Sequence, residues 1–271
     1  MGDSDIRAAK DFKKAVTAAK NRKDMFWRSQ APELAAMITD ALEQFNKEVK
    51  DPQLGVNALL DFYQRDAEIF ERCDDSFGNV GDVFRITAAK MFADYASRCT
   101  DKDKVANQIL ELQDDDSYGI RDVLIDKAAC FLDKGSIKEL INKIEKRIPS
   151  GEDITRQRQW LHMIESLARQ IKDGALFEST RERNWQGLNS RAYIDIAKVY
   201  FSSGDALTAY DRLQRAAERS SFDDFEYAEL FRDVCLALGK TEEVNKISWD
   251  IFRQHRCLET LNELIAQIGE D

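Results

Sequence analysis

Two short stretches of the chain carry the same acidic, aromatic and glycine residues. DDSFG occupies residues 74–78, and DDSYG occupies residues 115–119, forty-one positions later. Adjacent carboxylates suit hard cations or cationic partners. An EF-type calcium loop would need Asp at alternate positions and Glu at position 12, and neither stretch has that pattern. The stretches therefore predict either an acidic protein-binding rim or a pair of similar helix caps, with a metal-dependent hydrolase as a weaker alternative. The carboxylates concerned are Asp74, Asp75, Asp115 and Asp116.

In the cap interpretation, each stretch is a turn that starts a helix. An Asp or Ser side chain caps the helix, and the glycine takes a dihedral that other residues avoid. We then expect the aromatic residue, Phe77 or Tyr118, to pack between neighbouring helices.

A third candidate contact lies in the segment RERNWQG, residues 181–187. Arg and Trp are enriched at protein interfaces, where a few such residues carry most of the binding energy. Arg181, Arg183 and Trp185 are therefore predicted partner-binding residues.

The first 30 residues carry eight Lys or Arg against four Asp, although the whole chain has a formal net charge of −10. The negative total disfavours nonspecific nucleic-acid binding, which relies on neutralising phosphates. The basic segment is either a solvated helix face or a local nucleic-acid contact. Its candidate residues are Lys10, Lys13, Lys14, Lys20, Arg22 and Lys23.

Residues suited to catalysis are sparse. The two histidines are His162 and His255, and His255 lies two positions before Cys257, a spacing that points to different faces of a helix. HExxH, GxSxG, P-loop and GxGxxG motifs do not occur. We therefore expect no enzymatic activity, no cofactor and no metal.

The five cysteines are scattered along the chain, without a CxxC pair: Cys73, Cys99, Cys130, Cys235 and Cys257. Such a set predicts buried, reduced thiols in a cytoplasmic protein. The sequence also contains no apolar run of membrane-spanning length and no secretory signal.

Apolar periodicity predicts helices throughout. Val56, Leu59, Leu60 and Tyr63 recur at helical spacing, and only 3 Pro and 12 Gly interrupt the chain. We expect an all-α fold of about 12–13 helices. The expected ranges are 4–23, 32–49, 53–72, 79–98, 102–112, 118–133, 136–147, 153–173, 188–202, 205–219, 224–238, 241–254 and 257–268. Ser136 and Glu139 form a predicted capping box, and residues 173–190 form a long connection or an irregular helix.

Two repeat signals predict stacked helix pairs. Five apolar positions after DDSFG recur forty residues later: Val80, Val83, Phe84, Ala88 and Met91 match Ile120, Val123, Leu124, Ala128 and Phe131. Gly204 and Gly239, in segments with tetratricopeptide-like spacing, lie 35 residues apart. We therefore expect an α-solenoid with a repeat array over 1–150 and tetratricopeptide-like repeats over 151–271, continuous as one superhelix.

Three stretches together resemble a bacterial family of helical-repeat proteins of unknown function: residues 73–92, 112–132 and 248–265. Some members carry a SWIM-type zinc finger ahead of the repeats. This sequence has no Cys-x-Cys…Cys-x-His finger, so the zinc and nucleic-acid association of those members is not implied. The resemblance implies a fold and a bacterial origin, but no activity.

The sequence thus predicts a non-enzymatic scaffold that holds a protein or peptide on the concave face of an α-solenoid. The alternative is a nucleic-acid-associated protein, which would act through its basic first helix or with a DNA-binding partner.

Overall fold

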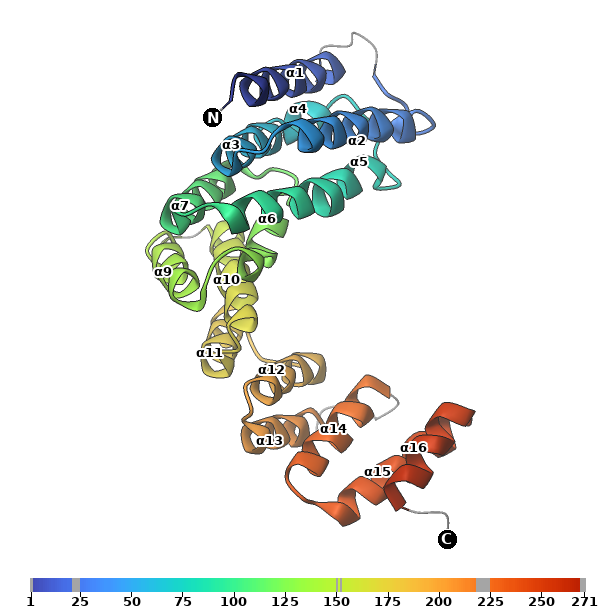
Figure 1. Cartoon of the computed structure of the whole chain (residues 1–271). Helices are drawn as coiled ribbons and strands as arrows, with labels where there is room; N and C mark the ends of the chain where they lie inside the picture. The colour runs from blue at the N-terminus through green and yellow to red at the C-terminus, as the bar shows by residue number, and fades with distance from the viewer. Residues whose placement is uncertain (1, 21–24, 150, 152, 218–224, 269–271) are drawn as a thin grey trace. The chain divides into compact units, whose positions relative to one another are not determined.

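The computed structural model of the chain describes residues 2–20, 25–149, 151, 153–217 and 225–268. Within these ranges every regular element is a helix, apart from an isolated bridge between Phe26 and Cys73 (Figure 1). The prediction of an all-α fold with packed helix pairs is therefore confirmed. No helix in the described ranges is both long and apolar enough to cross a membrane.

The chain divides into two compact units, Met1–Ser150 and Gly151–Asp271. The division falls in the PSGED turn, residues 149–153, where a proline and a glycine interrupt the helical pattern.

The first unit places its helices in two rows. One row is α1 (Asp3–Lys20), α3 (Pro52–Tyr63), α7 (Lys102–Leu112) and α9 (Lys134–Glu145), each packed against the next. The other contains α2 (Ala31–Glu48), α5 (Asn79–Asp82) with a π-helical turn (Val83–Ala88) and α6 (Ala89–Arg98), and α8 (Asp122–Asp126). A short helix, α4 (Asp66–Phe70), follows α3.

Aromatic side chains fill the centre of this unit. The rings of Phe62 and Phe84 stack with their centroids 4.3 Å apart, and Tyr63 donates a hydrogen bond to the carbonyl of Phe84 at 2.7 Å. A Cβ at Gly55 would lie 2.2 Å from the ring of Tyr95, so only glycine lets α6 approach α3 this closely. These contacts hold the two rows together.

Two helices expected to be continuous are broken, so the described chain forms more segments than predicted. The expected helix 53–72 breaks after Tyr63 into α3 and α4, and the expected helix 118–133 becomes α8 and a 3₁₀ turn, Ala128–Cys130. The first break places Asp66 at the start of α4, where it meets Arg121 from the second broken segment. Apolar spacing alone does not reveal such a break.

The predicted capping box at Ser136 is wrong. Helix α9 begins two residues earlier, and the Asp133 carboxylate accepts a hydrogen bond from the Ser136 N–H at 2.9 Å. This backbone bond lowers the pKa of Asp133. Asp is as good an N-cap as Ser, so composition does not distinguish the two starts.

The second unit is a run of consecutive helices: α10 (Ile154–Gln170), α11 (Gly174–Asn184), α12 (Ser190–Ser202), α13 (Ala206–Ala217), α14 (Phe225–Ala237), α15 (Thr241–Gln254) and α16 (Leu258–Ile268). Each packs against the next. Residues 173–190, expected to form a long connection or an irregular helix, contain helix α11 over Gly174–Asn184. The sequence left these alternatives open because the residues of the segment are mostly polar and lack a clear apolar stripe.

Three turns in this unit close in the same way. Lys172, Gly204 and Gly239 have φ angles of 58°, 92° and 70°. The residue after each donates its backbone N–H to the carbonyl five positions earlier, at 2.9, 3.0 and 3.0 Å. This bond is typical of a Schellman helix end. The pairs α10–α11, α12–α13 and α14–α15 thus share one turn geometry, and the first was missed because its left-handed residue is a lysine.

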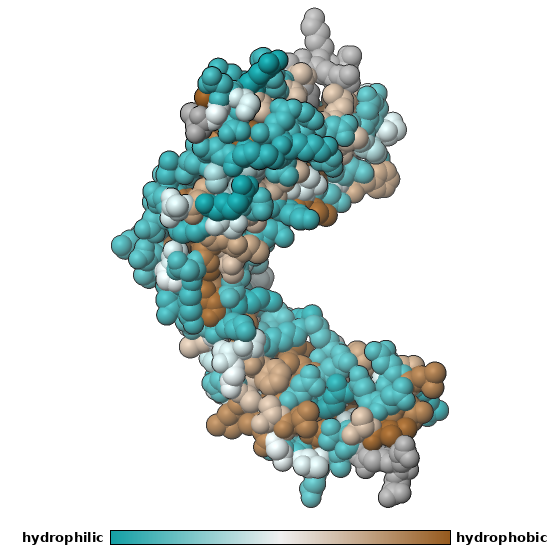
Figure 2. Space-filling view, in the orientation of Figure 1, coloured by the Kyte–Doolittle hydropathy of each residue, from teal (hydrophilic) through white to brown (hydrophobic). Residues whose placement is uncertain are grey.

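The hydrophobic core of the second unit lies between these pairs, and its buried members include Phe177, Ile196, Ala197, Leu213 and Val234. Hydrophobic residues also reach the surface over α13 to α16, as the brown areas of Figure 2 show. The exposed large apolar residues of these helices are Leu207, Leu236, Trp249, Leu258 and Ile265.

Candidate binding surfaces

The first acidic stretch is a backbone cap. The two carboxylate oxygens of Asp75 accept hydrogen bonds from the N–H groups of Val80 and Gly81, at 2.9 and 2.8 Å. Gly78, which lies between Asp75 and these two donors in the sequence, has a φ of 77°. The Asp75 side chain therefore satisfies two N–H groups at a helix start that have no partner within the helix.

The second stretch makes the same pair of bonds just before α8, which begins at Asp122. Asp116 accepts hydrogen bonds from the N–H groups of Ile120 and Arg121, at 3.3 and 3.1 Å, and Gly119 has a φ of 61°. The aspartates and glycines of the two stretches are related by forty-one positions, whereas the N–H donors are related by forty. The first stretch has one extra residue, Asn79, between its glycine and its first N–H donor, and the second stretch has no counterpart of it. The geometry supports the cap interpretation for Asp75 and Asp116.

The aspartates one position earlier, Asp74 and Asp115, have different contacts. Asp74 accepts hydrogen bonds from the hydroxyl and the N–H of Ser76, and these bonds lower the pKa of Asp74. Asp115 is exposed. Of the four predicted rim carboxylates, Asp74 and Asp115 are thus the two available to a partner.

The prediction that Phe77 and Tyr118 pack between helices is wrong. Their exposed fractions are 68% and 44%. The Arg28 guanidinium lies 3.7 Å from the Phe77 ring centroid, and Tyr118 stacks on Phe70 with centroids 5.0 Å apart. The first apolar residue after each glycine is buried instead: Val80 within α5, and Ile120 just before α8.

A buried ion pair links the second stretch to the first repeat. Arg121 makes two hydrogen bonds to the carboxylate of Asp66, at 2.9 and 2.6 Å, and a third to the carbonyl of Leu112 at 2.8 Å. Arg121 is 5% exposed and Asp66 1%. Sequence reasoning missed this pair because its members are 55 residues apart, and the only available sign was a lone Arg inside an acidic stretch.

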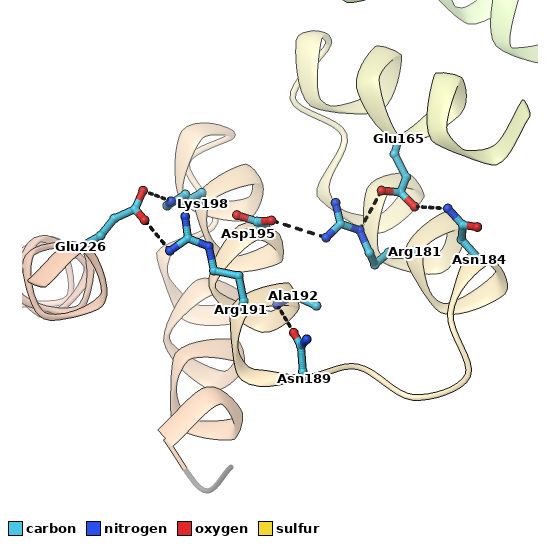
Figure 3. A network of polar contacts seen from close by, with 9 residues as sticks. All are labelled: Glu165, Arg181, Asn184, Asn189, Arg191, Ala192, Asp195, Lys198 and Glu226. Carbon is cyan, nitrogen blue, oxygen red and sulfur yellow. Dashed lines mark hydrogen bonds and ion pairs between the residues drawn. The ribbon is translucent and has the colours of Figure 1, made fainter. Parts of the chain in front are cut away.

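Arg181 is part of a buried polar network rather than a free surface residue (Figure 3). Its guanidinium contacts Glu165 at 2.7 Å and Asp195 at 3.4 Å, and Asn184 donates to Glu165 at 3.1 Å. The network joins α10, α11 and α12. Because Arg181 pairs with the buried Glu165, its charge is largely neutralised within the unit and is a poor contact for a partner.

Trp185 and Arg183 lie at the surface. Trp185 is 52% exposed, and the Arg158 guanidinium lies 5.7 Å from its ring centroid. Arg183 is exposed on the last turn of α11. The structure thus separates these two predicted contacts from Arg181.

The predicted basic segment forms most of α1, and part of its charge is neutralised. Lys13 pairs with Asp61 of α3 at 3.1 Å, and Lys14 pairs with Asp11 at 3.2 Å. Lys10 is exposed. Arg22, Lys23 and the side chain of Lys20 lie outside the described residues.

Two adjoining grooves run along the α1–α3–α7 row. The first, between α1 and α3, has a volume of about 350 Å³. The second, between α3 and α7, has a volume of about 390 Å³, and both are lined by Asn57 and Asp61 of α3. A third groove, of about 470 Å³, lies in the second unit beside Tyr227, Phe231 and Ile247 of α14 and α15. No sequence pattern pointed to these grooves, since each depends on which helices pack together.

Amide side chains line the ridge between the two grooves of the first unit. Gln53 and Gln108 both donate to the side-chain oxygen of Asn57, at 3.0 and 3.1 Å. The buried side-chain oxygen of Gln108 has no hydrogen-bond partner within the described part of the chain. Amide side chains can both donate and accept, as a peptide backbone requires.

The cysteines are only partly as predicted. All five are free thiols, and Cys73, Cys99 and Cys235 are buried, but Cys130 and Cys257 are exposed. Burial, with Glu243 nearby, raises the pKa of Cys235 to about 12, whereas Thr260 lowers the pKa of Cys257. In the ranges that the structure covers, no group of three His, Cys, Asp or Glu residues is arranged to hold a metal ion.

Comparison with known proteins gives a family but no activity. No curated protein matches the chain. A family model described as "Family of unknown function" matches residues 2–199, a range that includes the first two of the three stretches singled out above and excludes the third, residues 248–265. Because this match covers most of the chain, the protein belongs to that family of unknown function, DUF6880.

Proposed function

We propose that the protein is a non-enzymatic scaffold, an α-solenoid of stacked helix pairs that binds a protein or peptide segment along its α1–α3–α7 row. The observation that carries this proposal is the pair of adjoining grooves on one row of helices, which share Asn57 and Asp61. Solenoids present one row of helices as a concave binding surface. We assign that role to this row.

The amide ridge supports a peptide as the bound partner. An extended segment has unpaired N–H and C=O groups, and its backbone can hydrogen-bond to side chains that both donate and accept. Asn57 and Gln108 offer such groups, and Gln64 lines the α3–α7 groove beside them.

Secondary contacts and location belong to the same proposal. In the second unit, Arg183 and Trp185 are exposed and form a separate candidate contact for a partner. The free thiols fit a reducing, cytoplasmic compartment.

A display selection tests the proposal. Random peptides on phage are selected against the immobilised full chain, and the enriched peptides are then titrated in solution. Ala58 lies partly exposed in the α1–α3 groove, so Ala58→Trp fills it. We expect enriched peptides that bind the wild type and Ala36→Trp, a matched change on the exposed face of α2, but not Ala58→Trp. A selection that yields no groove-dependent peptide would remove the proposal.

The basic helix keeps a second candidate function open, binding of nucleic acid through Lys10, Lys13 and Lys14. It has less support, because Lys13 and Lys14 already pair with aspartates. A fluorescent DNA duplex and a single-stranded RNA at low salt provide the test. This function predicts strong, salt-sensitive binding that Lys13→Glu with Lys14→Glu abolishes, whereas the scaffold proposal predicts no binding.

A further inference from the structure

The floor of the α1–α3 groove is apolar. Phe12 and Val16 of α1 and Phe62 of α3 are buried at its base. Four smaller or partly exposed apolar residues complete the lining: Ile6, Ala9, Leu54 and Ala58. A volume of about 350 Å³ is near the lower end of the range for small-molecule pockets, so the groove has room for a few apolar side chains rather than for a large cofactor.

The rim of the same groove is cationic. The charged residues that line it are Lys10, Lys13, Arg65 and one carboxylate, that of Asp61. Lys13 and Arg65 share this carboxylate, at 3.1 and 3.7 Å, and Lys10 is exposed. The rim therefore has an excess of two positive charges on a chain whose formal net charge is −10. Such a local reversal favours a partner of negative charge.

An apolar floor and a cationic rim together specify the partner. We infer that the α1–α3 groove binds an acidic amphipathic segment of a partner protein, with its apolar side chains on the floor and its carboxylates beside Lys10, Lys13 and Arg65. This inference rests on the proposed scaffold function and adds the chemistry of its ligand. A nucleic acid satisfies the rim but leaves the apolar floor uncovered, and a neutral apolar segment leaves the cations unmatched.

Three fluorescent peptides of about eight residues, which span roughly 26 Å when extended, test the inference against the full chain. The first alternates Leu and Glu, so that an extended chain carries Leu on one side and Glu on the other. The second replaces Glu with Lys, and the third keeps Glu but replaces Leu with Ser. Titrations followed by fluorescence anisotropy should give at least a tenfold tighter Kd for the first peptide than for either of the others, and its affinity should fall as salt is added.

Two variants locate the binding. Ala58→Trp, which blocks the floor, and Lys10→Glu with Lys13→Glu, which reverses the rim, should each weaken the first peptide at least tenfold. Lys90→Glu with Lys138→Glu makes the same charge change on exposed residues of α6 and α9, and should leave the affinity within about twofold. Urea unfolding of every variant shows whether it is folded.

The inference is overturned if the acidic and basic peptides bind equally, if the groove variants bind as tightly as the control, or if the groove is occupied by a second copy. A second copy would appear as a dimer in light scattering that Ala58→Trp dissociates. If display selection yields groove-dependent peptides without acidic residues, this inference fails while the scaffold function stands. If it yields no groove-dependent peptide, both fail.

Discussion

The two acidic turns of the first unit share a pair of aspartate bonds but differ in length by one residue, Asn79, and in the residue that donates the second N–H. In both, the aspartate accepts hydrogen bonds from two backbone N–H groups at or just before a helix start, and a glycine takes a left-handed conformation. The second N–H donor is Gly81 in the first turn and Arg121 in the second. Gly81 is a small residue at a crowded corner, where a Cβ would lie 2.9 Å from the Arg85 side chain. Arg121 instead reaches Asp66 and forms the buried ion pair.

The repeated residues therefore set the geometry of the turn, and the residue that differs sets the contact between repeats. If the two turns consisted only of the residues that they share, both would be capped but no ion pair would connect the repeats.

Removing the Arg121 charge should have the largest effect. Arg121→Met leaves the Asp66 carboxylate buried without its partner, and the cost of an uncompensated buried charge is about 3–5 kcal/mol. Urea denaturation should show this loss in the free energy of unfolding. The double variant Asp66→Leu with Arg121→Met replaces both charges by apolar groups and should recover most of the loss. If the double variant is as unstable as the single one, the ion pair is not the reason for the loss.

The capping aspartates come next. Asp75→Ala and Asp116→Ala each remove the acceptor for two backbone N–H groups, so each should lower the free energy of unfolding by about 1–2 kcal/mol. Asp74→Ala and Asp115→Ala, one position earlier, should have clearly smaller effects. Thermal unfolding of the four variants gives the comparison. Equal losses at all four positions would contradict the assignment of one cap per turn.

Replacing Gly78 or Gly119 by alanine should lower the free energy of unfolding by the same amount. A Cβ at Gly78 or Gly119 would meet no atom within 4 Å, so the only cost of alanine is the left-handed backbone, about 1 kcal/mol in each turn. Chemical denaturation should give the same loss for Gly78→Ala and Gly119→Ala. A difference well above the error of the measurement would mean that the turns do not share one framework.

The smallest expected effect is the loss of the Asp74 contribution to stability at low pH. The Ser76 bonds lower the pKa of Asp74 below its usual value of 3.8, so the contribution of Asp74 to stability is present above that value and is lost as the pH falls through the lowered pKa. The melting temperature of the wild type should exceed that of Asp74→Ala at pH 6, and the two should converge near pH 2. A difference that persists unchanged in acid would assign the effect to something other than the carboxylate charge.

Local patterns predicted much of the fold. The all-α class followed from apolar spacing, and the offset of forty between Val80 and Ile120 matches the spacing of the cap donors in the structure. The break after Tyr63 was not predicted, because it places Asp66 beside Arg121, which is 55 positions away in the sequence, and the break within 118–133 was not predicted either. The turn at Lys172, the third of its kind in the second unit, was not predicted, because a lysine gives no sign of a left-handed backbone.

The candidate site was less predictable. Asp115 and Trp185 are exposed and Asp74 is half-buried, whereas the Arg181 charge is paired in a network with Glu165 that no local pattern reveals. The basic face of α1 was visible in the sequence, but the groove beneath it was not. A groove exists only once α3 packs against α1, and that pairing depends on tertiary contacts.

The most direct test of the proposed function compares the α1–α3 groove with the acidic turns in one binding experiment. The acidic amphipathic peptide is titrated against the wild type, Ala58→Trp, and Asp74→Asn with Asp115→Asn. We predict that Ala58→Trp weakens binding at least tenfold while the aspartate variant retains the wild-type Kd. Binding that survives Ala58→Trp and is lost in the aspartate variant would place the site at the turns and contradict a groove-binding scaffold.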